Sequence, residues 1–139
     1  MRNFINKAFV CLTIISSIVF SSCSDSGEIL EELSISEKVG LLEKGEWLLK
    51  GFEDRVMHTF VDGKRHTYYG QNNVFSNEAI PGTQEYKIEG NLLTIDYNFG
   101  NISTYEVKFS CDNTIVEFYK NGQLGTTLYK RGSSYKDCI

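Results

Sequence analysis

The chain has 139 residues, enough for one domain of conventional size and too few for two. Hydrophobic residues make up 41% of it and charged residues 23%, which favours a packed core and excludes global disorder. The formal net charge of -4 lacks the basic footprint of a nucleic-acid-binding protein, so no nucleic-acid partner is expected.

The first 22 residues have the features of a secretory signal peptide. A positively charged start, with Arg2 and Lys7, precedes an apolar run over residues 8–20. That run is shorter than the roughly 20 residues that a membrane-spanning helix needs. We therefore expect export of the chain and removal of residues 1–22.

A cysteine stands directly at the end of the apolar run, in the segment Phe20-Ser21-Ser22-Cys23. A bulky apolar residue, two small residues and a cysteine resemble the lipobox of bacterial lipoproteins. The resemblance implies that the Cys23 thiol takes a diacylglycerol, with acyl chains such as palmitate, and that this lipid holds the chain at a membrane. An ordinary secreted protein cut near the same place and an uncleaved anchor are the alternatives.

An acidic neck, residues 23–35, follows the lipidation site. Seven acidic residues against two lysines fall within residues 25–46. Such a stretch is either a solvated surface near the membrane or a sorting signal. The residue after Cys23 is Ser24. An aspartate at that position would resemble the signal that retains lipoproteins in the inner membrane of some Gram-negative bacteria. The resemblance therefore favours the outer membrane of the cell envelope.

The remaining residues, 36–139, are predicted to form one domain that starts with a short helix. Ser34 and Glu37 have the spacing of a capping box, and Val39 and Leu42 give the helix an apolar side. Gly45 ends the helical pattern.

From Trp47 onward, two-residue turn signals made of Gly, Asn and Asp recur between apolar-rich runs. These residues adopt the positive φ angles of hairpin turns. The runs predict eight strands, at residues 46–52, 55–61, 65–69, 84–89, 92–99, 102–110, 114–120 and 123–131. Residues 74–76 either extend the third strand or form a stub within the long turn-rich loop 70–83.

Apolar and polar side chains alternate along the later predicted strands. Leu93, Ile95, Tyr97 and Phe99 share one face, for example, while Thr94 and its polar neighbours share the other. A flat sheet with this pattern would leave two open edges and a large exposed apolar face, and closure into a barrel removes both. The sequence therefore predicts an all-β fold, a single eight-stranded antiparallel up-and-down barrel with a short N-terminal helix.

The predicted inner face of this barrel is rich in aromatic residues. It is either the wall of an apolar pocket or a filled core, because small eight-stranded barrels have room for little more than their own side chains. The candidate pocket residues are Tyr86, Ile95, Tyr97, Tyr105, Val107, Phe109 and Phe118.

The two ends of the predicted barrel carry a family resemblance. The first strand opens with Gly45-Glu46-Trp47, and the last ends in Leu-Tyr-Lys-Arg at residues 128–131. This arrangement resembles the lipocalin-like domain family, especially the small bacterial lipocalin-like lipoproteins. The resemblance implies that Gly45 allows a close approach of the chain, that Trp47 plugs the barrel base and that Arg131 stacks on the indole.

The same resemblance implies that the barrel binds a small apolar or amphipathic molecule. Binding would occur at the mouth opposite Trp47, with loop 70–83 and the 62–64 turn as rim elements. No cofactor is expected.

Cys111 ends the sixth predicted strand, and Cys138 lies in the C-terminal tail. In an up-and-down barrel the sixth and eighth strands end on the same rim, roughly 10 Å apart. The tail can fold back over that rim, and a disulfide there would add ~3–4 kcal/mol of stability in the chain-entropy model. Two separate thiols are the alternative.

His58 and His66 flank the Asp62-Gly63 turn. A three-residue loop would place them on one face of the hairpin, and a two-residue loop would place them on opposite faces. A zinc site needs about four convergent ligands, so no metal is expected here. The nucleophile and phosphate-binding motifs of common enzymes are absent from the sequence, and no catalytic activity is expected.

Two other functions compete with a small-molecule carrier. The first is a protein-binding module, since small barrel lipoproteins that inhibit lysozyme resemble this layout and insert a loop bearing Ser and Lys into the enzyme. Loop 70–83 has Ser76 but no lysine, which counts against a direct match. The second is a structural accessory of an envelope complex, whose protein partner the sequence does not identify.

Overall fold

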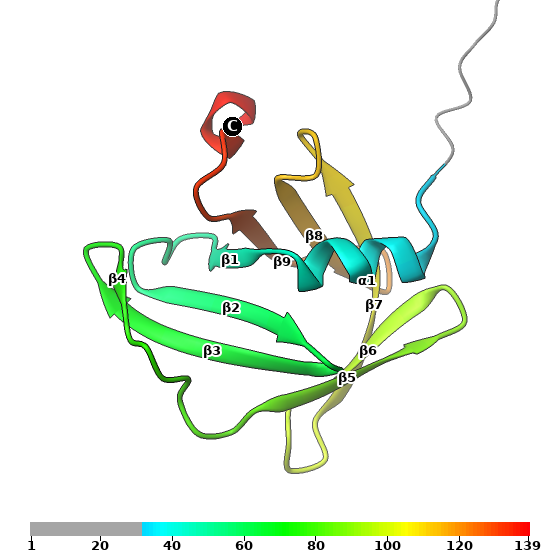
Figure 1. Ribbon diagram of the computed structural model, residues 1–139. Coiled ribbons are helices and arrows are strands. Elements are labelled where there is room, and N and C mark those ends of the chain that lie inside the picture. Colours follow the sequence, from blue (N-terminus) through cyan, green and yellow to red (C-terminus); the bar gives the residue numbers. More distant parts are fainter. Residues whose placement is uncertain (1–31) are drawn as a thin grey trace, which may run out of the picture. The chain divides into compact units, whose positions relative to one another are not determined.

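The computed structural model describes residues 32–139, as a helix, nine strands and a short C-terminal 3-10 helix (Figure 1). The predicted signal peptide, the Cys23 lipidation site and most of the acidic neck lie outside the described residues. The helix α1 spans Ile35–Glu43 and the 3-10 helix η1 spans Tyr135–Cys138. The strands are β1 (Glu46–Leu49), β2 (Val56–Val61), β3 (Lys64–Gln71), β4 (Val74–Phe75), β5 (Gln84–Glu89), β6 (Leu92–Asp96), β7 (Ile102–Ser110), β8 (Ile115–Lys120) and β9 (Gln123–Lys130).

The capping box predicted before α1 is present. The Ser34 side chain accepts a hydrogen bond from the Glu37 backbone N–H, and the Glu37 carboxylate accepts one from the Ser34 N–H at 2.8 Å. These bonds satisfy two backbone donors that a helix start leaves free. The side chains that α1 buries are mainly apolar, Ile35, Val39 and Leu42 among them.

Eight of the strands close into an antiparallel barrel. The hydrogen-bonded order is β2-β1-β9-β8-β7-β6-β5-β3, and pairing of β2 with β3 closes the ring. The two-residue β4 is the stub, folded back on the end of β3 through a tight turn at Asn72 and Asn73. The predicted fold class, an eight-stranded barrel after one short helix, is confirmed.

The pairing of β3 with β5, which we call the seam of the barrel, is short. β3 pairs with β5 through only two residue pairs, Lys64 with Glu85 and Arg65 with Gln84. β2 and β3, joined by the two-residue Asp62-Gly63 turn, share six pairs by contrast. The long connection between β3 and β5 therefore leaves their pairing short.

The prediction of a strand over residues 92–99, with Phe99 on its inner face, is wrong at the C-terminal end. β6 ends at Asp96, whose carboxylate accepts a hydrogen bond from the Asn98 N–H at 2.7 Å and starts a turn. Asn98, Phe99 and Gly100 all have positive φ angles, which a strand does not allow. The Phe99 side chain is consequently fully exposed at the turn, not directed into the barrel.

Two hydrophobic cores lie on the two sides of the barrel wall. The inner core unites α1 with the inward faces of the strands around Trp47 and Phe60. The outer core lies on β1, β2, β8 and β9, and its buried members are Leu48, Met57, Ile115, Tyr129 and Tyr135. Tyr135 comes from η1 and stacks on Tyr129 with ring centroids 4.4 Å apart, so the C-terminal tail covers this outer face.

Cys111 and Cys138 form the disulfide that the sequence predicts, with their Cα atoms 6.1 Å apart. It ties η1, beyond the end of β9 in Figure 1, to the end of β7. The closed ring, both cores and the disulfide all lie within the compact unit Glu31–Ile139. This unit therefore contains the interactions needed for it to fold when produced alone. Within residues 32–139, no helix combines the length and the hydropathy that crossing a membrane requires.

Candidate functional site

α1 closes one end of the barrel around a fully buried tryptophan. The Trp47 Nε1–H donates a hydrogen bond of 2.8 Å to the Leu42 carbonyl, and Phe109 meets the indole edge-on at 5.8 Å. A Cβ atom on Gly45 would lie 2.9 Å from the indole Cε2 and Nε1 atoms, so the tryptophan needs a glycine there. These contacts agree with the closing roles predicted for Gly45 and Trp47.

The predicted stacking of Arg131 on the Trp47 indole is wrong. Lys130 pairs with Trp47 across β9 and β1, and side chains alternate along a strand, so Arg131 falls on the outer face. There its guanidinium lies 5.0 Å from the Phe75 ring centroid, and its Nη1 atom lies 2.9 Å from a Glu46 carboxylate oxygen. Arg131 therefore fastens β4 to the outside of the barrel.

The seven predicted pocket residues all lie in or against the inner core. Four of them are buried, namely Tyr86, Ile95, Val107 and Phe118, and the other three, Tyr97, Tyr105 and Phe109, are partly buried. Edge-to-face contacts join many of the inner rings, such as Phe60 with Tyr86 at 5.6 Å and Tyr105 with Phe118 at 5.9 Å. Near α1 the inner face is a filled core, while Tyr97 and Tyr105 retain exposure toward the other end.

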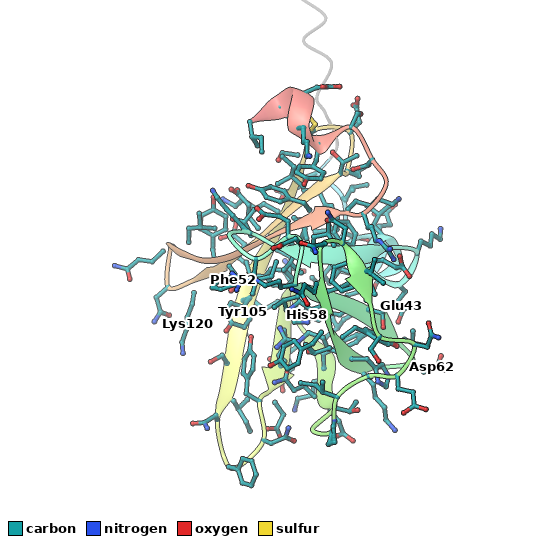
Figure 2. All side chains as sticks on the ribbon, turned by 90° about the vertical axis from the view of Figure 1, so that its left-hand side faces the viewer. Glu43, Phe52, His58, Asp62, Tyr105 and Lys120 are labelled. Carbon is teal, nitrogen blue, oxygen red and sulfur yellow. A yellow bond between two sulfur atoms is a disulfide. The ribbon has the colours of Figure 1, made fainter. Side chains whose placement is uncertain are left out.

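That other end is the mouth of the barrel, where the β1–β2, β3–β5, β6–β7 and β8–β9 connections meet. Four side chains define what we call the mouth cluster: Arg65, Gln84, Tyr97 and Tyr105. Arg65 pairs with the fully buried Phe60 across β3 and β2, so its side chain enters the barrel. In Figure 2 the labelled Tyr105 and His58 lie toward the middle of the molecule, whereas Lys120 and Asp62 lie at its margins.

Arg65 is a partly buried cation without a carboxylate partner among residues 32–139. Its guanidinium lies over the Tyr97 ring, 5.0 Å from the centroid, and its Nε atom is buried with no hydrogen-bond partner among residues 32–139. Burial lowers the pKa of Arg65, and the opposing influences come from the Tyr97 and Tyr105 hydroxyls. The Oε1 atom of Gln84, its pairing partner at the seam, is likewise buried and unpartnered.

The two tyrosines of the mouth cluster are hydrogen-bonded to each other. The Tyr97 hydroxyl donates to the Tyr105 hydroxyl at 2.9 Å. Burial, and then this hydrogen bond, raise the pKa of Tyr97 well above its usual range, so the hydroxyl stays protonated. Within residues 32–139 the Tyr105 O–H finds no acceptor, which leaves it free to donate to a bound molecule.

The two histidines lie on opposite faces, because the Asp62-Gly63 turn has two residues. His58 faces inward, and its Nδ1 atom lies 3.0 Å from the Thr67 hydroxyl. Burial, and then the positive charge of Arg65, lower the pKa of His58 to about 3, so its ring is neutral at physiological pH. Within residues 32–139, no three His, Cys, Asp or Glu side chains gather in a metal-binding group.

The two predicted rim elements, the 62–64 turn and loop 70–83, lie in different parts of the barrel. The 62–64 turn lies at the end closed by α1, since the Tyr86 N–H donates to the Gly63 carbonyl and the Tyr86 hydroxyl donates to Glu43 of α1 at 2.6 Å. Arg65, the residue after this turn, nevertheless extends its side chain to Tyr97 in the mouth cluster. Loop 70–83 does leave β3 at the mouth, but β4 then packs on the outer face.

Between β4 and the barrel wall lies a hollow of about 470 Å³, which we call the outer groove. Its main lining residues are Glu46, Met57, Tyr68, Phe75, Ser76 and Arg131. Ser76, the serine singled out in loop 70–83, accepts a hydrogen bond from the Glu78 N–H.

Sequence reasoning missed Arg65 and Gln84. A signal for Arg65 was present, because a two-residue Asp62-Gly63 turn forces Phe60 to pair with Arg65 and an inward Phe60 makes Arg65 inward. No comparable signal exists for Gln84, since a long loop precedes it.

The chain matches no protein-family model, and neither curated proteins nor solved structures show a significant similarity to it. The geometry of the mouth cluster therefore supplies the basis for assigning a function.

Proposed function

We propose that this chain is a small-molecule-binding lipoprotein of the cell envelope, whose barrel takes an amphipathic ligand at its mouth. The observation that carries the proposal is the change along the inner face. Trp47 and Leu42 at the helix end are fully buried, while Tyr97 and Tyr105 at the mouth are only partly buried and lie beside unpartnered polar atoms. Aromatic walls with a few convergent polar groups are typical of ligand sites.

Ligand binding at the mouth would cover apolar ring surface there and give hydrogen-bond partners to polar atoms that have none. Covering apolar ring surface stabilises a complex by about 25 cal/mol per Å². Buried polar atoms such as Arg65 Nε gain more from a partner than exposed atoms do, because they have already lost water. Both gains favour a ligand with an apolar part and a polar part.

The sequence supports the location in this proposal. The signal-like residues 1–22 and the lipobox-like segment ending in Cys23 support a lipid anchor at the envelope, and Ser24 favours the outer membrane. The resemblance to lipocalin-like lipoproteins points to the same class of protein.

The outer groove supports a second candidate, a module that binds a protein partner. It presents aromatic and charged groups, with Phe75 and Arg131 on one side and Glu46 beside them. Arg131 already has an ion pair and a stacking partner, however, so this groove holds fewer unsatisfied groups than the mouth.

Native mass spectrometry tests the proposal. The unit Glu31–Ile139 would be exported into an envelope compartment, purified without detergent and weighed before and after solvent extraction. We expect an adduct at one ligand per chain that the solvent releases. The adduct should weaken in Tyr105→Ala and persist in the matched control Tyr119→Ala, whose ring lies outside the barrel. A bare mass that a panel of amphiphiles leaves unchanged contradicts the proposal and directs attention to the outer groove.

A further inference from the structure

Arg65 differs from the other arginines of the described chain. Arg55 lies 3.6 Å from an Asp54 oxygen, and Arg131 lies 2.9 Å from a Glu46 oxygen, both at the surface. Arg65 is more deeply buried and has no ion pair among residues 32–139. A buried charge is normally paired, because the protein interior replaces the hydration that the charge loses.

The surroundings of Arg65 do not compensate its charge. Tyr97 offers a cation–π contact through its ring and a polar interaction through its hydroxyl, and each of these is weaker than an ion pair with a carboxylate. His58 is neutral, and burial raises the pKa of Tyr97, so its hydroxyl stays protonated at physiological pH. The mouth therefore carries one uncompensated positive charge inside a largely apolar wall.

We propose that the ligand is an amphipathic monocarboxylic acid, whose carboxylate binds the Arg65 guanidinium while its apolar chain covers the aromatic wall. This inference rests on the proposed function of the barrel. A guanidinium presents its donors as a planar fork that matches the two oxygens of a carboxylate. The charge of one carboxylate balances Arg65, whereas a phosphate monoester, with a charge near -1.5 to -2, would leave an excess of negative charge in the mouth.

The neighbours of Arg65 can complete the binding of a carboxylate. The Tyr105 hydroxyl, which accepts from Tyr97, still has its own hydrogen to donate. Rotation of the Gln84 amide by 180° exchanges its unpartnered oxygen for the NH₂ group, which is also a donor. Three donors from β3, β5 and β7 would then converge on one anionic group.

Calorimetric titration of the unit Glu31–Ile139 with four ten-carbon probes tests this inference. The probes are decanoate, decan-1-ol, decyl phosphate and decyltrimethylammonium, at pH 7.5 and below their critical micelle concentrations. We expect decanoate to bind one per chain, at least roughly tenfold more tightly than decan-1-ol and more tightly than decyl phosphate. The cationic probe is expected not to bind.

Arg65→Met is the decisive variant, because methionine keeps an unbranched apolar stem without the charge. We expect its affinity for decanoate to fall roughly 30-fold, with decan-1-ol unaffected and the melting temperature unchanged or raised. Lys64→Met is the matched control, since this variant removes one positive charge from an exposed position of the same strand. Arg65→Lys keeps the positive charge but not the planar fork of donors. We expect its loss of affinity for decanoate to lie between the losses of Lys64→Met and Arg65→Met.

Each remaining outcome has a definite meaning. Equal affinities for decanoate and decan-1-ol, or tighter binding of decyl phosphate, overturn the monocarboxylate while leaving the binding function in place. Wild-type affinity for decanoate in Arg65→Met also overturns it. If Arg65→Met does not fold, a wild-type affinity in Arg65→Lys overturns the role of the guanidinium fork. No binding of any probe overturns both this inference and the proposed function.

Discussion

The two ends of the barrel use the same inner face for opposite purposes. At the helix end the polar atoms have partners, as Trp47 Nε1 has the Leu42 carbonyl and the Tyr86 hydroxyl has Glu43. At the mouth, Arg65 Nε and Gln84 Oε1 have none. The helix end therefore supplies the stability of this small domain, whereas the mouth gives up stability that a ligand can restore.

The largest expected effect comes from emptying the helix end. Trp47→Ala removes a fully buried ring and the hydrogen bond to Leu42, and we expect it to lower the free energy of unfolding by about 3–5 kcal/mol. Tyr105→Ala at the partly exposed mouth should cost roughly 1–2 kcal/mol. Urea unfolding followed by circular dichroism measures both. Equal losses would contradict the assignment of stability to the helix end.

Removing the disulfide is expected to have the next largest effect. The double variant Cys111→Ser, Cys138→Ser opens a link with a sequence separation of 27 residues and should lose ~3 kcal/mol. The link secures η1 over the outer core, on the other side of the barrel wall from the mouth cluster, so ligand affinity at the mouth should not change. Urea midpoints give the stability, with wild type in a reducing agent as a second route to the same state. A matching loss of decanoate affinity in the folded variant would show that the two ends are coupled.

His58, on the inner face, makes the free energy of unfolding depend on pH. Its pKa is about 3 in the folded chain and about 6.5 when unfolded, so between these values the unfolded state binds one more proton. Its contribution is complete above pH 6.5 and is lost as the pH falls toward 3, at about 1.4 kcal/mol per pH unit.

The variant His58→Gln, compared with wild type, isolates this contribution. Wild type should lose about 2 kcal/mol more than His58→Gln between pH 7 and pH 5, as measured by urea unfolding at each pH. The control His66→Gln, on the outer side of the hairpin, should keep the acid sensitivity of wild type. Parallel pH profiles for wild type and His58→Gln would show that His58 has the same pKa in the folded and the unfolded state.

The helix end was more predictable from the sequence than the mouth, and the reason is physical. The capping box at Ser34, the two-residue turns and the alternation of the strands are local patterns, and they fix neighbouring strands in register. The disulfide of Cys111 with Cys138 follows from that topology, because both residues reach the same rim. Local patterns thus gave the closed barrel and the core around Trp47.

The mouth depends on relations that local patterns do not contain. Arg65 faces Gln84 across the seam, after a loop whose length leaves the register of β5 undetermined. Phe99 continued the alternation of its strand, yet Asp96 and Asn98 begin a turn that the pattern does not reveal. A missing partner, as at Arg65 Nε, becomes visible only when every neighbour has been placed.

The smallest expected effect is also the sharpest test of the contrast between the two ends. Gln84→Met replaces a side chain whose oxygen is buried without a partner by an apolar one of similar length. An unsatisfied buried polar atom costs stability, so this change should leave the free energy of unfolding unchanged or raise it by up to about 1 kcal/mol. Gln123→Met, at an exposed position of β9, is the control for the general effect of methionine, and urea unfolding compares the two. A clear loss of stability in Gln84→Met alone would mean that the Gln84 oxygen has a partner in solution. Arg65 Nε would then be the one unpartnered atom of the mouth cluster among residues 32–139, and the contrast with the helix end would rest on Arg65 alone.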